Sequence, residues 1–480
     1  MSKNQYIGIT IGPIFDTINL TSSPAALWAA SYIFSSLAKN VCKILTEEYG
    51  VLPEQIISPY YNKDDELLKK NDGIGLFHDR IIFCAEGFDT SKMPEVRRAA
   101  IVMTAEQFGL EKHIDYLNEY IMLESVGFEA DNPILESATL LDCIELAKPF
   151  VFEETRNPIL DLFENANQGE GAQTGKNEAV KALTTGFRDF QLKKPSGSLK
   201  SISDIVQTGT GYKKFKYYAL LRSDGDNMGQ IIASLNTDSE ITSFSKTCLE
   251  YCSEVASAAG GYGGVTIYSG GDDLLALLPC ENNGRTVFDF VAEANAIFKR
   301  HFSKYNKPTS LSFGIAIAYN SFPLYEALEQ SADLLFGTAK AVKNCIAVNL
   351  QKHSGQSAGL LIPNSALESW QNLSRHVAKE KDETLLSAMH KLALFETVFN
   401  GADDYRTIHN LFINTFDAED HTDNNFVHTI LPEVFRSLQA NKEQLTVCAI
   451  NNGKIVKNNS VLTMQSMLRL QKFFIEKGGE

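Results

Sequence analysis

The sequence lacks the features that mark secreted and membrane proteins. Its 480 residues include eight cysteines, and none of them forms a CxxC pair. Scattered thiols of this kind favour the reducing cytoplasm over a disulfide framework or a tetrahedral zinc site. No window approaches the ~18 consecutive apolar residues that a membrane helix needs. The opening MSKNQYIGITIGPIF has the pattern of a strand and not of a signal peptide, so we expect a cytoplasmic protein without membrane contact.

An excess of basic residues is also missing. The chain has 44 Lys and Arg against 59 Asp and Glu, a formal net charge of −15. Proteins that hold RNA by bulk electrostatics neutralise its phosphates with Lys and Arg, so we expect little RNA binding by this chain alone. The most basic short runs, 192–201 and 213–216, are typical of solvated loops. Contact with a nucleic acid or a neighbouring subunit is the alternative for these runs.

The hydrophobic content of 44% is typical of a globular chain, and two stretches show one pattern of elements. Each reads as β-α-β-β-α-β, the order of a ferredoxin-like unit. In the first stretch the expected strands and helices are 5–13, 24–48, 54–61, 80–87, 93–113 and 119–125. In the second they are 216–224, 227–259, two strands within 263–279, then 284–303 and 309–320, with an added helix 324–341 and strand 345–350.

These patterns predict an α+β fold with two ferredoxin-like palm domains and two helical domains. The expected boundaries are 1–127 for the first palm-like domain, 128–209 for a helical domain with a polar loop at 164–178, 210–352 for the second palm, and 353–480 for a C-terminal helical domain. Helices are expected there at 363–400, 403–416, 425–440 and 462–476.

Acidic residues mark two places in the second palm. Asp224 ends an apolar strand in LLRSDGDNMG, and Asp272 and Asp273 form the tip of a hairpin in YSGGDDLLALL. The first strand and the central hairpin of a ferredoxin-like sheet are adjacent, so these three carboxylates are expected to converge. Carboxylates that lie so close together repel one another unless divalent cations neutralise them.

Two Mg²⁺ or Mn²⁺ ions about 4 Å apart can clamp the attacking and leaving oxygens of a displacement at phosphorus. We expect Asp224, Asp272, Asp273 and the carbonyl of Gly225 to hold them. Gly270 and Gly271 would allow a nucleotide to approach the backbone closely. The alternative is that GGDD is only a hairpin turn, since glycine and aspartate are common in turns.

Three segments together carry a family resemblance: YYALLRSDGDNMG, GGVTIYSGGDDLLALLP and LSFGIAIAYNSFPLYEALEQSADLLFGTAK. They resemble the polymerase/cyclase-like large subunit of type III CRISPR RNA-guided effector complexes, in its Cmr branch. The N-terminal IGPIFD and LWAASYIFSSLA are similar to the first palm-like domain of that subunit. The resemblance covers residues 5–126 and 210–355.

The resemblance implies two facing palms with ATP between them, in a complex with other effector subunits, guide RNA and target RNA. The active palm would polymerise ATP into a cyclic oligoadenylate messenger when target RNA is bound. An acceptor such as S-adenosylmethionine is the alternative to a second ATP.

By the same resemblance, Asp224 and Asp273 match metal ligands and Asp272 matches the second acidic position. Lys340 matches a lysine that contacts the triphosphate. Asp226 is placed beside the nucleotide, where supporting the loop is the alternative to holding metal. Ser31, in LWAASY, is expected to face the nucleotide from the first palm.

The first palm lacks these acids, since Ile-Gly-Pro-Ile stands where the second has Ser-Asp-Gly-Asp. Asp64 and Asp65 are interpreted as a solvated charge run, so one catalytic site is expected. His78-Asp79 is similar to the HD dipeptide of metal-dependent phosphohydrolases, but no companion histidines are spaced for metal. The chain also starts at the first palm, so no nuclease is expected. Cys248 and Cys252 are expected to pack in the core.

Two other functions stay open. A diguanylate cyclase has a similar GGDEF turn, but it would place Phe after the acidic pair, where this chain has Leu274. A non-catalytic scaffold subunit would have the same two-palm fold, but it would not need the acids.

Overall fold

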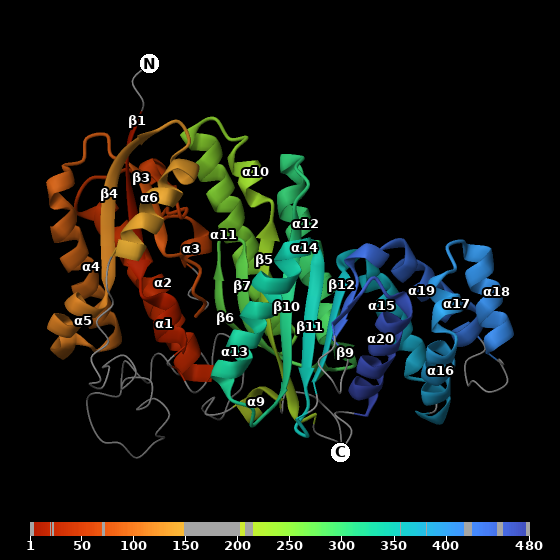
Figure 1. Ribbon diagram of the computed structural model, residues 1–480. Helices are drawn as coiled ribbons and strands as arrows, with labels where there is room; N and C mark the ends of the chain where they lie inside the picture. Colours follow the sequence, from red (N-terminus) through yellow and green to blue (C-terminus); the bar gives the residue numbers. More distant parts are fainter. Residues whose placement is uncertain are drawn as a thin grey trace, which may run out of the picture. The chain divides into compact units, whose positions relative to one another are not determined.

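The structure is a computed structural model that describes residues 4–19, 21, 24–69, 73–147, 202–206, 215–355, 357–380, 382–416, 425–448 and 455–476. The chain forms two compact units. One comprises Met1–Ile205, Asn227–Leu277 and Ala296–Thr309, and the other comprises Val206–Asp226, Leu278–Asn295 and Ser310–Glu480. Figure 1 shows their helices and strands in the colours of the chain order. Within the described residues, no helix combines the length and the apolar character needed to span a bilayer.

The first unit contains a four-stranded antiparallel sheet with the order β2-β3-β1-β4. Its strands are β1 (Asn4–Gly12), β2 (Ile56–Ser58), β3 (Arg80–Cys84) and β4 (Met122–Ala130). In the register, Ile7 of β1 pairs with Phe83 of β3 and with Gly127 of β4. This is the strand order of a ferredoxin-like sheet, as the sequence predicts.

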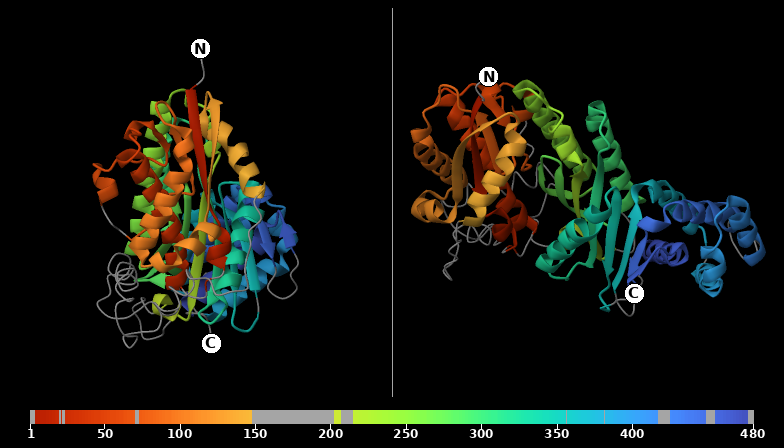
Figure 2. Two further views of the ribbon diagram at one scale, coloured as in Figure 1. Left: turned by 90° about the vertical axis from the view of Figure 1, so that its left-hand side faces the viewer. Right: turned by 45° about the horizontal axis from the view of Figure 1, so that its top comes forward.

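Helices cover both faces of this sheet, which explains the nearly continuous apolar run of β1. Helix α2 (Pro24–Glu47) packs against α4 (Met93–Phe108) and contacts β1 and β3, and Figure 2 shows these two helices in red and orange. Helix α6 (Pro133–Ala147) packs against β1 and β4. Thr10 of β1 donates to Glu145 of α6 over 2.5 Å. Strand β1 is therefore buried from both sides.

The same unit contains the central hairpin of the second palm. Its elements are α10 (Met228–Ile232), α11 (Asp238–Gly261), β6 (Val265–Gly270) and β7 (Asp273–Pro279). A capping box starts α11, because Thr237 Oγ1 accepts from the Glu240 amide and Glu240 accepts from the Thr237 amide. Helix α11 packs on β6 and on β2, and it ends at the glycine pair that predicts its end.

The second unit carries most of a larger sheet. Its strands are β5 (Tyr217–Asp226), β10 (Ser310–Tyr319), β11 (Cys345–Gln351), β12 (Ser357–Pro363), β13 (Thr446–Cys448) and β14 (Ile455–Lys457). Among the described residues, the second unit contributes strands in the order β14-β13-β12-β11-β10-β5, and the first unit contributes the paired strands β7 and β6. The α+β class with two palm-like sheets is therefore confirmed.

Helices complete the second unit. They are α12 (Val287–Phe302, shared with the first unit), α13 (Leu324–Ala332), α14 (Lys340–Val342), α15 (Leu367–Val377), α16 (Asp382–Leu394), α17 (Glu396–Asn400), α18 (Tyr405–Thr415), α19 (Leu431–Ala440) and α20 (Ser460–Ile475). Helix α9 (Ile202–Val206) lies in the first unit except for its last residue. Trp370 of α15 is fully buried against Phe288 of α12, so it is a packing residue.

The structure departs from the sequence pattern in several places. The predicted helix 227–259 is two helices, α10 and α11, with a break between Ile232 and Asp238. Strands β12, β13 and β14 extend the sheet where only helices are expected after residue 352. The predicted helix 324–341 is three elements, since a π-helix, η7 (Asp333–Ala339), lies between α13 and α14. The predicted domain boundaries stay a prediction. The loop 164–178, the run 192–201 and residues 213 and 214 lie outside the described residues.

Candidate nucleotide and metal site

Strand β5 ends in the Asp-Gly-Asp segment that the sequence analysis selects. In the register with β10, Asp224 pairs with Ser312 and Asp226 pairs with Ser310. The two aspartates differ in environment, because the Asp224 side chain is 20% exposed whereas Asp226 is completely buried. The exposed fraction leaves Asp224 accessible to a ligand.

Asp226 is held by donors of the protein. Its carboxylate accepts from Ser310 Oγ at 2.7 Å and from Ser312 Oγ at 2.9 Å. It also accepts from the backbone N–H of Asn344, just before β11, at 2.8 Å. Asp226 therefore links β5 to β10 and to the start of β11. These contacts fit a role in supporting the loop, which is the alternative to holding metal.

Lys340 connects the same segment to the end of the π-helix. Its Nζ lies 2.6 Å from the Gly225 carbonyl oxygen, 2.8 Å from Asp224 Oδ2 and 3.3 Å from Asp226 Oδ1. The Asp224 carboxylate and the Gly225 carbonyl, both predicted metal ligands, thus point at one cation. Hard oxygen donors converging in this way are the donor set that Mg²⁺ and Mn²⁺ prefer, so the residues fit such a metal.

The hairpin between β6 and β7 presents the second group of predicted residues. Gly270 pairs with Asp273, and Gly271 adopts a φ of +71° at the turn. Cys252 Sγ donates to the Gly271 carbonyl at 3.3 Å, which fixes the turn to α11. Asp272 and Asp273 are half-buried on this turn. Within the first unit, the hairpin is therefore a supported element and not a free loop.

A loop of the first palm supports the hairpin from another side. The Ser269 amide donates to the Gly75 carbonyl at 3.1 Å. Helix α2 positions this loop, since Trp28 Nε1 donates to the Gly73 carbonyl and Ser35 Oγ accepts from the Phe77 amide. Trp28 is buried and serves this packing.

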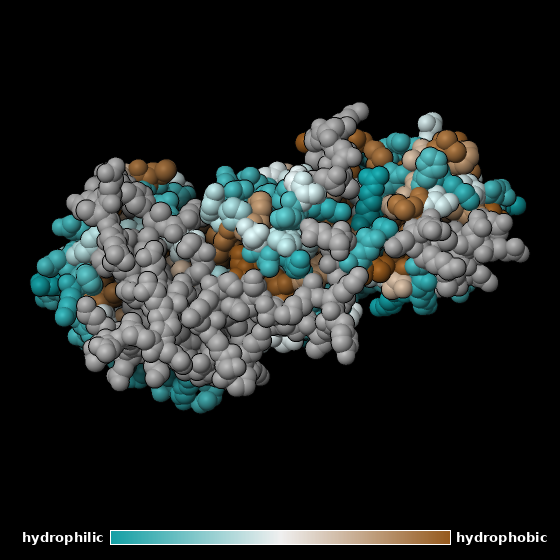
Figure 3. All heavy atoms as spheres, turned by 90° about the horizontal axis from the view of Figure 1, so that it is seen from below, coloured by the Kyte–Doolittle hydropathy of each residue, from teal (hydrophilic) through white to brown (hydrophobic). Residues whose placement is uncertain are grey.

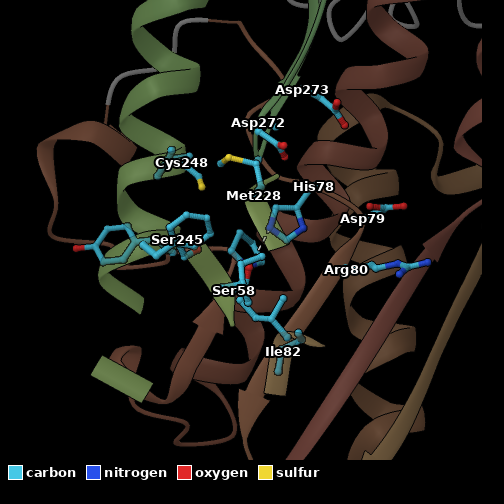
Figure 4. A pocket seen from close by; sticks show the side chains of 18 of the residues that line it. Ser58, His78, Asp79, Arg80, Ile82, Met228, Ser245, Cys248, Asp272 and Asp273 are labelled. Atoms are coloured by element: carbon cyan, nitrogen blue, oxygen red, sulfur yellow. Dashed lines mark hydrogen bonds between the residues drawn. The ribbon is translucent and has the colours of Figure 1, made fainter. Parts of the chain in front are cut away.

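A cavity of about 280 Å³ in the first unit is lined by the whole GGDD turn. Figure 4 shows Asp272 and Asp273 on one side of it, with His78 and Asp79 below them as drawn. The first palm contributes β2, β3 and their neighbours, and α10 and α11 close the apolar side. The polar lining residues are Ser58, Tyr60, His78, Asp79, Arg80, Ser137, Ser245, Tyr268, Asp272 and Asp273.

The ionisable groups of the first palm in this cavity have shifted pKa values. Burial, with a contribution from the Arg80 guanidinium, lowers the pKa of His78 to about 4, so the imidazole is neutral at pH 7. Burial raises the pKa of Asp79, against the opposing effect of Arg80. Burial also raises the pKa of Tyr268, and the nearby Asp79 and Asp273 raise it further. His78 Nε2 lies 3.1 Å from Ser58 Oγ.

The sequence analysis missed the part of this cavity that the first palm supplies. His78 was singled out only for its similarity to another motif, and no sequence pattern indicated Ser58 or, on β6 of the second palm, Tyr268. Ser31 does not line the cavity; it is 2% exposed, and its predicted role stays a prediction. Cys248 lines the apolar side.

Asp65 differs from its interpretation as part of a solvated run. Its carboxylate accepts from Lys246 Nζ at 2.7 Å and from the Tyr60 hydroxyl at 2.9 Å. The hydrogen bond from Lys246 is the largest cause that lowers the pKa of Asp65 to about 2. Only Asp64 of the pair is exposed. Asp65 is thus a structural contact between the first palm and α11.

Comparisons with known proteins give the same assignment for both sheets. The family model for the second palm domain of Cas10/Cmr2 matches residues 217–347, and the model for the N-terminal part of the CRISPR-associated protein Cmr2 matches residues 6–113. The chain is 30% identical over 188 residues to the CRISPR system Cmr subunit Cmr2 of Pyrococcus furiosus. That match covers 33% of this chain and 21% of the relative, so the chain matches only about a fifth of the relative's length.

Solved structures show the same fold at low sequence identity. A cryo-EM structure of the type III-B Cmr-β complex bound to cognate target RNA contains a chain with a TM-score of 0.64 and 12% identity, covering 100% of this chain and 83% of that one. A Csm1–Csm4 cassette in complex with AMPPNP gives a TM-score of 0.55 and 14% identity, covering 91% of this chain and 70% of that one. With one family model on each palm-like sheet, these matches support a Cas10/Cmr2-like subunit of type III CRISPR complexes.

Proposed function

We propose that this chain is the nucleotidyltransferase subunit of an RNA-guided type III CRISPR complex. On binding of target RNA it uses ATP and two divalent metal ions, Mg²⁺ or Mn²⁺, to make an adenylate second messenger, with release of pyrophosphate. The observation that carries the proposal is the cavity lined by Gly270, Gly271, Asp272 and Asp273. A turn with no function would not need four residues facing one cavity, two of them carboxylates.

The metal ligands in this proposal are Asp224, Asp272, Asp273 and the carbonyl of Gly225. When bound, the two ions lower the pKa of the attacking hydroxyl and neutralise charge on the phosphates. The convergence of Asp224 with the hairpin stays a prediction. Two observations support the two parts of this ligand set separately. Asp224 and Gly225 direct oxygens at one cation, the Lys340 ammonium. The carboxylates of the hairpin line one cavity.

The residues of the chain position the nucleotide and exclude water. Gly270 and Gly271 let the backbone approach the phosphates, and Lys340 is a cation that the triphosphate can attract. The apolar side of the cavity, which includes Met228 and Leu249, provides a low-polarity environment that strengthens these electrostatic interactions.

The acceptor is either a second ATP, giving a cyclic oligoadenylate, or another adenosine-containing metabolite such as S-adenosylmethionine. The volume of about 280 Å³ lies near the lower end for ligand pockets, which fits one nucleoside-sized group. Ser58 and neutral His78 of the first palm, together with Tyr268 of β6, are the polar groups that would contact it.

The proposal includes partner subunits, guide RNA and target RNA. The solved relatives are named as parts of multi-subunit assemblies, one of them bound to target RNA. The C-terminal helices of this chain also expose large apolar side chains, among them Leu394 at 66% and Val398 at 53%. Figure 3 shows brown apolar atoms among the teal at that end of the molecule. Exposed apolar groups of this kind are typical of surfaces that partners cover.

The test is the product made by the assembled complex. Incubated with ATP, Mg²⁺ and target RNA, with and without S-adenosylmethionine, it is expected to release pyrophosphate and form an adenylate detectable by mass spectrometry. Omitting target RNA or adding EDTA is expected to stop the reaction. A complex that retains guide RNA and all subunits but turns over no nucleotide would contradict the proposal and favour the scaffold. Conversion of GTP to a cyclic dinucleotide by the isolated chain would favour a diguanylate cyclase.

A further inference from the structure

Lys340 places its charge where the proposed metal would be. Its ammonium is 2.6 Å from the Gly225 carbonyl and 2.8 Å from Asp224 Oδ2, the distances of charge-assisted hydrogen bonds. Both of these oxygens are metal ligands in the proposed function. Two cations within a few ångströms of each other repel strongly, so the ammonium and a divalent ion cannot share these oxygens.

We propose that Lys340 is an internal counter-cation that occupies this metal position until a nucleotide attracts it to the phosphates. The inference rests on the proposed function and adds a regulatory step to it: metal binds Asp224 tightly only when a nucleotide is present. The lysine thereby prevents a free divalent ion from occupying the site without its substrate.

The two aspartates respond differently to the loss of the lysine. Asp226 keeps hydrogen bonds from Ser310, Ser312 and the Asn344 amide, so it stays satisfied when the ammonium leaves. Asp224 exchanges its ion pair with Lys340 for the metal. The exchange is therefore confined to Asp224 and Gly225.

The backbone at Lys340 is fixed while its side chain can turn. Lys340 follows the π-helix η7, and this helix packs on β10 at Gly314, where a Cβ would lie 2.5 Å from the Leu335 nitrogen. The Lys340 side chain is 22% exposed, and its four methylene groups are joined by rotatable bonds. The displacement therefore needs a rotamer change only.

The experiment measures Mn²⁺ binding to the full chain by electron paramagnetic resonance, with and without a non-hydrolysable ATP analogue. For the wild type we expect the analogue to increase Mn²⁺ affinity at least about tenfold. For Lys340→Gln we expect Mn²⁺ affinity without the analogue to rise about tenfold above wild type, and the analogue to add little. A tenfold change corresponds to about 1.4 kcal/mol.

Three variants make the test decisive. Lys340→Arg keeps the positive charge and is expected to behave like the wild type without nucleotide, and Lys343→Gln makes the same charge change on an exposed neighbouring lysine. Asp224→Asn identifies the binding that depends on this site. If Asp224-dependent Mn²⁺ binding without nucleotide is equal in the wild type and in Lys340→Gln, the counter-cation role of Lys340 is wrong, whereas the proposed function is not contradicted. If no Mn²⁺ binding depends on Asp224 under any condition, both are wrong.

Discussion

Replacing Asp272 and Asp273 together by asparagine is expected to lower ATP turnover by the assembled complex at least about 10³-fold. The amide keeps the size of each side chain but removes its charge. The phosphates and the attacking hydroxyl then lose the metal ions that these carboxylates would hold, and the rest of the cavity cannot replace them. The measurement is the rate of pyrophosphate release with target RNA and Mg²⁺.

The same variant separates a functional role from a structural one. Two half-buried neighbouring carboxylates repel each other, so their neutralisation is expected to leave the melting temperature unchanged or to raise it. The control is Asp64→Asn with Asp403→Asn, which removes two exposed carboxylates and is expected to leave turnover unchanged. Equal turnover in the wild type and the Asp272/Asp273 variant would show that the hairpin carboxylates do not take part in the reaction.

The elements that carry the site could be predicted because their signals are local. Strand β5 ends in charged residues, and the Gly-Gly pair before Asp272 requires a turn. Each is readable within about ten residues, so the Asp-Gly-Asp segment and the hairpin were located correctly. The same holds for α2, whose start carries proline, whereas the start of α11 was placed too early because its capping box at Thr237 was not used.

The lining of the cavity could not be predicted because it depends on packing between distant segments. Tyr268 illustrates this: a Cβ on Gly270 would lie 2.6 Å from its Cζ, so Gly270 leaves room for the aromatic ring. The ring then lies beside Asp79 of the first palm, almost two hundred residues earlier in the chain. No local sequence pattern predicts that Tyr268 lies beside Asp79.

The missed strands have a similar cause. Strand β12 has the sequence SAGLLIP, whose apolar run is also compatible with the start of a helix. It is a strand because all seven of its residues pair with β11, from Ser357 with Gln351 to Pro363 with Cys345. The π-helix is also a product of packing, because it lies where the predicted helix meets Gly314.

Gly314→Ala is expected to destabilise the second unit by about 3 kcal/mol, the upper range for overpacking a close-packed core. Gly314 lies in the middle of β10, paired with Arg222 on one side and Ala347 on the other. A methyl group there would lie 2.5 Å from the Leu335 nitrogen and 2.9 Å from its Cβ. These atoms belong to the π-helix, so the overlap cannot be relieved by turning a flexible side chain or displacing a water molecule.

The matched control is Gly337→Ala in the same π-helix. Nothing lies within 4 Å of the position of its Cβ, and the residue is exposed. Alanine is favoured over glycine in helical backbone by about 1 kcal/mol, so this variant is expected to be as stable as the wild type or more so. Denaturant unfolding followed by tryptophan fluorescence checks the difference, because Trp370 is buried in the same unit.

The effect of Gly314→Ala on function follows from the place of Lys340 at the end of this helix. The helix can relieve the overlap only by moving away from β10, and that movement carries the Lys340 backbone away from Asp224 and Gly225. We therefore expect Gly314→Ala to lose the nucleotide dependence of Mn²⁺ binding at temperatures where it is still folded, whereas Gly337→Ala keeps it. If the two variants have equal stability and equal coupling, the close approach of η7 to β10 does not position the lysine.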